Sequence, residues 1–180
     1  MGRRNTGKTA ARTALAGMFS ALSVVVLFLG YATGVLDLCA VAVTSMFIAV
    51  SMIELGGAYP YLVWAVTSVI SLVILPDKLL AFEYILFGGI YPILKLYFER
   101  IRRRWLEWVV KLAYAAAVLA VLYAMSQFVL GLPMETGVLA WALLVSYIVF
   151  FAAFDRSLTV TLTWYVIKIR PKLTFLKKLR

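Results

Sequence analysis

The stretch that decides the fold is Leu79–Arg104, with the sequence LLAFEYILFGGIYPILKLYFERIRRR. Its part Leu79–Phe98 is mainly apolar, and about 20 apolar residues in a helix cross the roughly 30 Å hydrocarbon core of a bilayer. An arginine cluster follows, made up of Arg100, Arg102, Arg103 and Arg104. Short loops rich in Lys and Arg stay on the cytoplasmic side of a membrane. The stretch therefore predicts a membrane span whose C-terminal end faces the cytoplasm.

The composition of the whole chain indicates the same environment. Of 180 residues, 64% are hydrophobic and 14% are charged, and the mean hydropathy is +0.98. Soluble domains have about 45–50% apolar and about 25% charged residues, so we expect lipid to be the solvent of a single membrane domain. The formal charge of +10 then indicates cytoplasmic anchoring at anionic headgroups, and not nucleic-acid binding. With no His and only Cys39, we expect no metal site and no cofactor.

Outward from this stretch, hydropathy predicts an all-α polytopic membrane bundle with six transmembrane helices. Both termini are then cytoplasmic, because this arrangement places every Lys and Arg except Lys78 on the inner side. We expect a basic tail at 1–12, a transmembrane domain at 13–169 and a second basic tail at 170–180. The predicted spans are Thr13–Leu29, Val35–Ile53, Ala58–Leu75, Leu79–Phe98, Trp105–Leu130, and a sixth from Gly137 to the inner boundary at Asp155 and Arg156.

The segment Leu158–Trp164 (LTVTLTW) alternates apolar and polar residues, a pattern that favours a strand in a soluble protein. An unpaired strand at a membrane leaves backbone groups without hydrogen bonds. We therefore expect this segment to continue the sixth helix or to lie as a helix at the interface.

Acidic residues gather at the predicted outer ends of the spans, at Asp37, Asp77, Glu83 and Glu135. Carboxylates in or near hydrocarbon usually face a cavity or a partner. We therefore expect an outward-facing pocket for a small cationic or hydrogen-bonding solute, with four candidate residues. The alternative is that these carboxylates lie at headgroup level or favour helix N-termini. The candidate solute-binding residues are Glu83, Asp37, Tyr84 and Gln127.

The fourth span carries Gly88, Gly89 and Pro92 in its middle, which predicts a kink or a broken helix. Broken helices near the midplane bind substrate in many transporters, but Gly and Pro are also packing devices, and both interpretations stay open. We expect Lys95 to extend its amine to the inner face near Glu99. For Asp155 we expect a local ion pair or a contact to a basic neighbour, and a proton relay is the alternative.

Small residues recur at helical spacing in and before the first span. Such faces let two helix backbones approach closely in lipid. They predict either packing within the chain or a docking face for a partner membrane protein. The candidate docking residues are Ala10, Ala14, Ala16, Gly17, Ser20 and Ala21.

Catalysis has little support in the sequence. Gly2–Thr9 fits the phosphate-loop pattern GxxxxGK[ST], but it leads into a membrane helix and follows no strand. Without His, acid–base chemistry would fall to Glu, Asp, Lys or Tyr, and no span pairs two carboxylates at helical spacing. We therefore expect that this protein is not an enzyme.

The six-span layout, with the small-residue face on the first helix, resembles the substrate-binding S components of bacterial energy-coupling-factor transporters. It is also similar to other bacterial six-span membrane proteins of this layout. The resemblance implies solute capture outside the inner membrane, docking of Ala10 and Ala14 on a transmembrane coupling subunit, and dependence on partner ATPase subunits. The segment Gly30–Gly34 is shorter than the first outer loop of many S components. The alternative from another class is a non-catalytic scaffold, similar to the MreD-like subunits of cell-wall machinery.

Overall fold

The computed structural model describes residues 2–99, 103–130 and 138–172, with side chains for 7–99, 103, 105–127 and 144–172. All regular structure in these residues is helical, which confirms the predicted all-α fold for this part of the chain. The elements are α1 (Gly2–Thr33), α2 (Asp37–Glu54), α3 (Tyr59–Ile74), α4 (Lys78–Glu83), the π-helix η1 (Tyr84–Gly89), α5 (Tyr91–Phe98), α6 (Arg104–Leu130), α7 (Val138–Trp164), the π-helix η2 (Tyr165–Ile169) and the 3₁₀ turn η3 (Arg170–Lys172).

Five helical stretches in the described residues are long and apolar enough to cross a membrane. The helix α3 is apolar but shorter, with 16 residues. Large apolar side chains are exposed along the helices, for example Val73 and Trp105, which are 77% and 75% exposed. Surfaces of this kind need lipid or a partner to cover them, so the chain has membrane-spanning character. The five stretches are Gly7–Thr33, Asp37–Glu54, Lys78–Phe98, Trp105–Gln127 and Leu144–Lys172.

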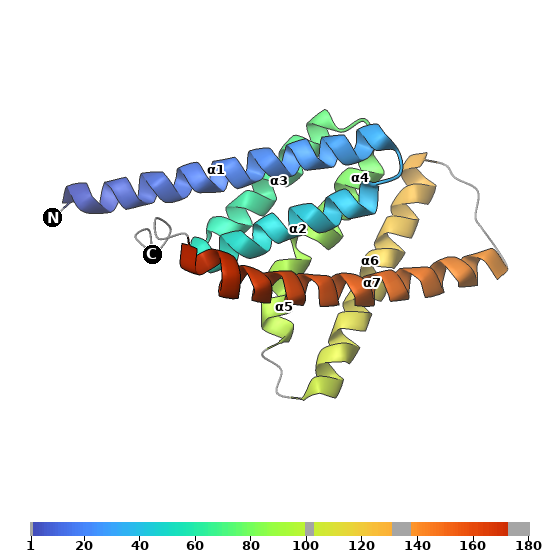
Figure 1. Ribbon diagram of the computed structural model, residues 1–180. Helices are drawn as coiled ribbons and strands as arrows, with labels where there is room; N and C mark the ends of the chain where they lie inside the picture. Colours follow the sequence, from blue (N-terminus) through green and yellow to red (C-terminus); the bar gives the residue numbers. More distant parts are fainter. Residues whose placement is uncertain (1, 100–102, 131–137, 173–180) are drawn as a thin grey trace.

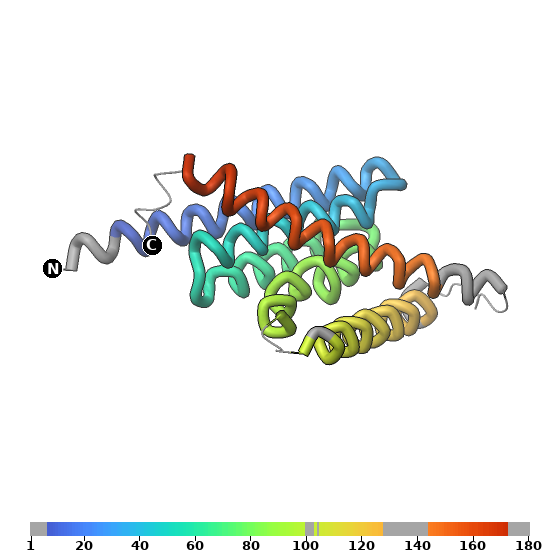
Figure 2. Tube along the Cα trace, turned by 60° about the horizontal axis from the view of Figure 1, so that its bottom comes forward, coloured from blue at the N-terminus to red at the C-terminus, as the bar shows by residue number. Residues whose placement is uncertain are grey.

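The helices form a bundle in which α1, α2 and α3 pack most extensively against one another. Figure 1 shows that α1 begins and α7 ends at one end of the molecule, on the left. At the opposite end, α1 ends while α2 and α4 begin. Figure 2 shows α6 along one edge of the molecule, next to α5.

The structure places the turns between helices close to the predicted gaps between spans. Gly34, Gly56 and Gly57 have positive φ angles of 66°, 63° and 57°, a conformation that glycine adopts without strain. Between α3 and α4, the Asp77 carboxylate accepts a hydrogen bond from the Leu79 amide at 2.8 Å and so caps α4. Lys78 Nζ donates to two carbonyl oxygens at the end of α3, both at 2.7 Å, so its charge stabilises that terminus.

The fourth predicted span is broken at its glycines, as expected, with the π-helix η1 between α4 and α5. Within a membrane, the carbonyl groups that such a break releases need partners from neighbouring helices. Three side chains from α3, α6 and α2 provide them: Trp64 Nε1 donates to Ile85 O at 3.1 Å, Tyr114 to Leu86 O, and Ser45 Oγ to Gly88 O at 2.7 Å.

The end of the sixth predicted span differs from the expectation. The helix α7 does not stop at Asp155 and Arg156, and Leu158–Trp164 continues it, as one of the two interpretations predicted. It runs on through η2 and η3, where Arg170 Nε lies 3.2 Å from the carboxylate of Glu54 in α2. Arg170 is therefore held against the bundle and does not begin a separate tail. At the other terminus, the expected tail is part of α1, and a helical Gly2–Thr9 forms no phosphate loop.

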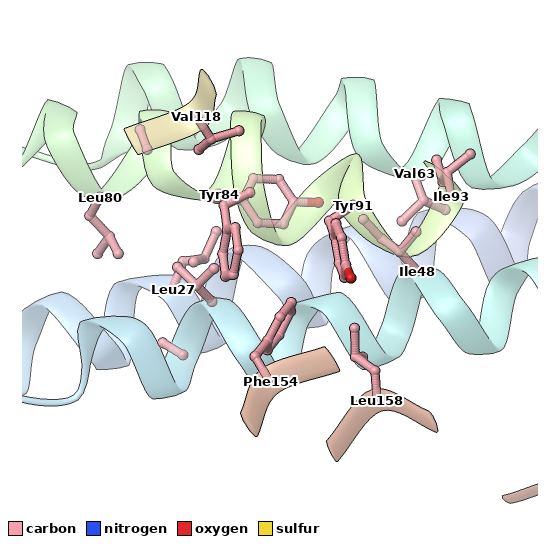
Figure 3. Packing of buried hydrophobic residues seen from close by; sticks show 14 of the residues in the cluster. Leu27, Ile48, Val63, Leu80, Tyr84, Tyr91, Ile93, Val118, Phe154 and Leu158 are labelled. Carbon is pink, nitrogen blue, oxygen red and sulfur yellow. The ribbon is translucent and has the colours of Figure 1, made fainter. Parts of the chain in front are cut away.

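Aromatic packing joins the broken helix to α7. The Phe87 ring lies 4.7 Å from that of Phe154, and the Tyr91 ring lies 5.8 Å from it, measured between centroids. Figure 3 shows Tyr91 pointing its hydroxyl toward the part of α7 that carries Phe154 and Leu158. Phe87 lines the first of the two polar regions described next, and Tyr91 forms a hydrogen bond in the second.

Candidate functional site

A cavity of about 250 Å³ lies at the end of the bundle where α2 and α4 begin, and Glu83 lines it. The wall comes from four helical segments, because α2, α4–η1, α6 and α7 meet there. Leucines from α2, α4 and α6 complete a mainly apolar lining. The other lining residues are Phe87, Tyr123, Ser126, Tyr147 and Phe150. We call this the Glu83 cavity.

The Glu83 carboxylate has no hydrogen-bond or ion-pair partner among the described residues. Two other carboxylates, those of Asp37 and Asp77, interact with it electrostatically. The cation closest in sequence, Lys78, is bound instead to the carbonyl groups that end α3. An uncompensated carboxylate in an apolar wall is costly and favours a positively charged occupant.

The structure brings only part of the predicted pocket together. Tyr84 is fully buried and does not line the cavity, because neighbouring residues on a helix point about 100° apart. For the same reason Ser126 lines the cavity and Gln127 does not. Asp37 contributes charge from outside the wall, and its Oδ1 is buried without a hydrogen bond in the described part of the chain. Binding by these residues stays a prediction.

The aromatic wall is the feature that the sequence interpretation missed. Phe87 is one helical turn after Glu83, and Tyr147 and Phe150 are one turn apart on α7. Their rings form a continuous surface, with the Phe87 centroid 6.4 Å from Tyr147 and 6.2 Å from Phe150. The i, i+4 spacing from Glu83 to Phe87 is a signal that was present in the sequence.

A second polar region consists of Lys95, Lys111 and Asp155, which we call the Asp155 cluster. These side chains come from α5, α6 and α7, and their residues are only 3%, 2% and 5% exposed. Lys95 Nζ binds the Asp155 carboxylate, and Lys111 Nζ lies 3.1 Å from its other oxygen. Tyr91 donates to Asp155 at 2.6 Å, and Lys95 also donates to Thr159 at 2.7 Å.

The Asp155 cluster corrects one expectation and confirms another. Lys95 does not extend to the inner face, because its amine is bound inside the bundle by the partner carboxylate on α7. Asp155 has the expected contact to basic neighbours, which are Lys95 and Lys111 on other helices. Two carboxylates on the same helices as the lysines lie beside the cluster, with Lys111 2.7 Å from Glu107 and Lys95 3.4 Å from Glu99. Because its groups bind one another, the cluster is suited to holding three helices together, and it leaves no carboxylate open to a solute.

The small residues of α1 divide between two faces. Ala16 and Ser20 are buried in the bundle, and Ser20 Oγ donates to Ala16 O at 3.0 Å. For these two residues the structure shows packing within the chain, which was one of the two predicted interpretations. The remaining four, Ala10, Ala14, Gly17 and Ala21, are exposed on one stripe, and docking there stays a prediction.

Comparisons with known proteins do not indicate a function for this chain. No protein-family model, no curated protein and no solved structure matches this chain. The described residues also contain no group of three or more His, Cys, Asp or Glu side chains that could hold a metal ion. The Glu83 cavity is therefore the candidate functional site.

Proposed function

We propose that this chain is a solute-binding integral membrane subunit of a transport system. It captures a small solute in the Glu83 cavity and is not an enzyme. The observation that carries this proposal is a single carboxylate without a described partner, facing a cavity of about 250 Å³. A filled bundle, with the carboxylates at headgroup level, would favour the MreD-like scaffold instead. The cavity favours solute binding because an unpaired carboxylate inside a bundle usually marks a ligand path.

The proposal includes six spans in a bacterial inner membrane, with both termini in the cytoplasm. Its support is the distribution of basic residues, of which only Lys78 would lie outside. The energy for transport comes from partner ATPase subunits, as the resemblance to S components implies. The exposed stripe of Ala10, Ala14, Gly17 and Ala21 would contact the transmembrane coupling subunit.

Cysteine labelling of intact cells tests this orientation. In a Cys39→Ser background, we expect Pro76→Cys to react with a membrane-impermeant maleimide added outside, because Pro76 is exposed in the predicted outer turn. Lys8→Cys, on the predicted inner side, should react only after the membrane is permeabilised. Reaction of Lys8→Cys in sealed cells would contradict the proposed orientation.

Native mass spectrometry of the protein released gently from its own membrane tests the function. We expect a small molecule retained at a 1:1 ratio, and we expect Glu83→Gln to lose it, since the change removes the charge but keeps the size of the side chain. Glu99→Gln is the matched control, because it makes the same chemical change outside the cavity lining, where Glu99 contacts Lys95. Both variants should keep the melting temperature within a few degrees.

Two results would overturn this function. One is a protein that retains no small molecule and holds a partner chain tightly, as a scaffold would. The other is a retained molecule that Glu83→Gln and Glu99→Gln affect equally, because the Glu83 cavity would then not be its site.

A further inference from the structure

We infer that the Glu83 cavity takes a small organic monocation, an ammonium that carries an aryl or alkyl group. This inference rests on the proposed function and adds the chemical class of the solute. Three properties of the cavity carry it: the balance of charge, the aromatic wall and the size.

The charge around the cavity is negative and unpaired. Glu83 is the one charged side chain in the described lining, and Asp37 and Asp77, which interact with it electrostatically, have the same sign. Lys78 supplies no compensation, because its amine donates to Leu72 O and Leu75 O, both at 2.7 Å. An anion would meet three carboxylates and no cation among these residues. A neutral solute would leave the Glu83 carboxylate without a counter-ion in an apolar wall.

The aromatic wall selects among cations. Phe87, Tyr147 and Phe150 face the same cavity as Glu83, and aromatic faces attract ammonium groups within about 6 Å of the ring centroid. Tyr147 donates its hydroxyl to Ala115 O at 3.2 Å, which fixes its ring. Tyr147 also lies close enough to Glu83 to interact with it electrostatically. The wall can therefore contact both the ammonium and the apolar group that it carries.

The same lining disfavours a metal ion. Hard cations take six or more oxygen ligands, whereas this lining offers one carboxylate and the hydroxyl groups of Ser126, Tyr123 and Tyr147. The described residues contain no cluster of three or more metal-ligating side chains. An organic cation needs one counter-ion and an apolar surface, and the Glu83 cavity provides both.

The size of the cavity sets the size of the solute. The cavity volume of about 250 Å³ is the volume that about eight water molecules occupy in the liquid, at about 30 Å³ each. Benzylammonium has eight non-hydrogen atoms and carries a positive charge at pH 7. Benzyl alcohol has the same number and is neutral, so the two form a matched pair of probes.

Isothermal titration calorimetry on the protein in nanodiscs of zwitterionic lipid tests the inference, with empty nanodiscs as the blank. We expect benzylammonium to bind saturably at a 1:1 ratio, benzyl alcohol to bind at least tenfold more weakly, and benzoate not to bind. In Glu83→Gln the preference should disappear, so that benzylammonium and benzyl alcohol bind with about equal affinity. In Phe150→Leu the affinity for benzylammonium should fall severalfold, and Glu99→Gln should bind as the wild type does.

The outcomes separate this inference from the proposed function. Equal binding of benzylammonium and benzyl alcohol, or binding of benzoate, overturns the cationic class. So does a co-purified solute that is neutral or anionic by mass and is lost in Glu83→Gln, although this result would support the solute-binding function. If no probe binds saturably and no solute is retained, the inference and the proposed function both fail.

Discussion

We expect Asp155→Asn to be among the most destabilising single substitutions in the chain. The carboxylate is the shared counter-ion of Lys95 and Lys111, and all three residues are at least 95% buried. Removing this charge leaves the two buried ammonium groups with only the more exposed carboxylates of Glu107 and Glu99, and breaking a buried ion pair costs about 3–5 kcal/mol. The measurement is the melting temperature of the purified protein in detergent, together with the yield of folded protein from the membrane.

Two further variants show whether the buried charge is the cause. Glu99→Gln removes a carboxylate that is 40% exposed and should cost about 1 kcal/mol or less. The triple variant Lys95→Met, Asp155→Leu, Lys111→Met removes the whole Asp155 cluster and should recover much of the stability, because apolar residues of similar volume often replace buried ion pairs without loss. An Asp155→Asn protein as stable as the wild type would contradict the counter-ion role.

The helical architecture could be predicted because it depends on local sequence properties. Leu79–Phe98 has the length and hydropathy of a span, and its glycines predicted the break that η1 forms. Asp77 could be recognised as a helix-capping residue from its position just before an apolar run. None of these features depends on how one helix rotates against another.

The polar contacts could not be predicted fully because they depend on helix rotation. Ending the sixth span at Asp155 placed this residue at the membrane boundary, whereas α7 continues past it and turns it toward α5 and α6. In a continuous helix, the side chains of two consecutive residues point in directions about 100° apart. The same geometry places Glu83 in the cavity and Tyr84 in the core.

The small residues of α1 show the same limit on one helix. Spacing alone grouped six positions, but only packing against the rest of the bundle decides which of them remain exposed. Ala16 and Ser20 lie on the inward side, so they serve the fold, and Gly17 lies on the exposed stripe. A small-xxx-small pattern identifies a face for close approach without identifying what approaches it.

Gly88→Ala is the second substitution for which we expect a large loss of stability. A Cβ atom at this position would overlap Val41 Cγ1, and it would lie 3.0 Å from Val41 O and 3.1 Å from Ser45 Oγ. The helices α2 and η1 would have to separate, which would also weaken the hydrogen bond from Ser45 Oγ to Gly88 O, 2.7 Å long in the native protein. Overpacking costs about 1–3 kcal/mol, and the hydrogen bond contributes about 1 kcal/mol more.

Gly17→Ala makes the same chemical change where nothing lies within 4 Å of the added atom. It should leave stability unchanged or raise it by about 0.5–1 kcal/mol, because alanine favours the helix more than glycine does. Adding Val41→Ala to Gly88→Ala removes the side-chain overlap and leaves the close backbone oxygen, so we expect partial rescue of the melting temperature and a coupling between the two sites. Equal melting temperatures for Gly88→Ala and Gly17→Ala would show that α2 and η1 are not packed at this distance, and the π-helical break would then need a cause other than close approach.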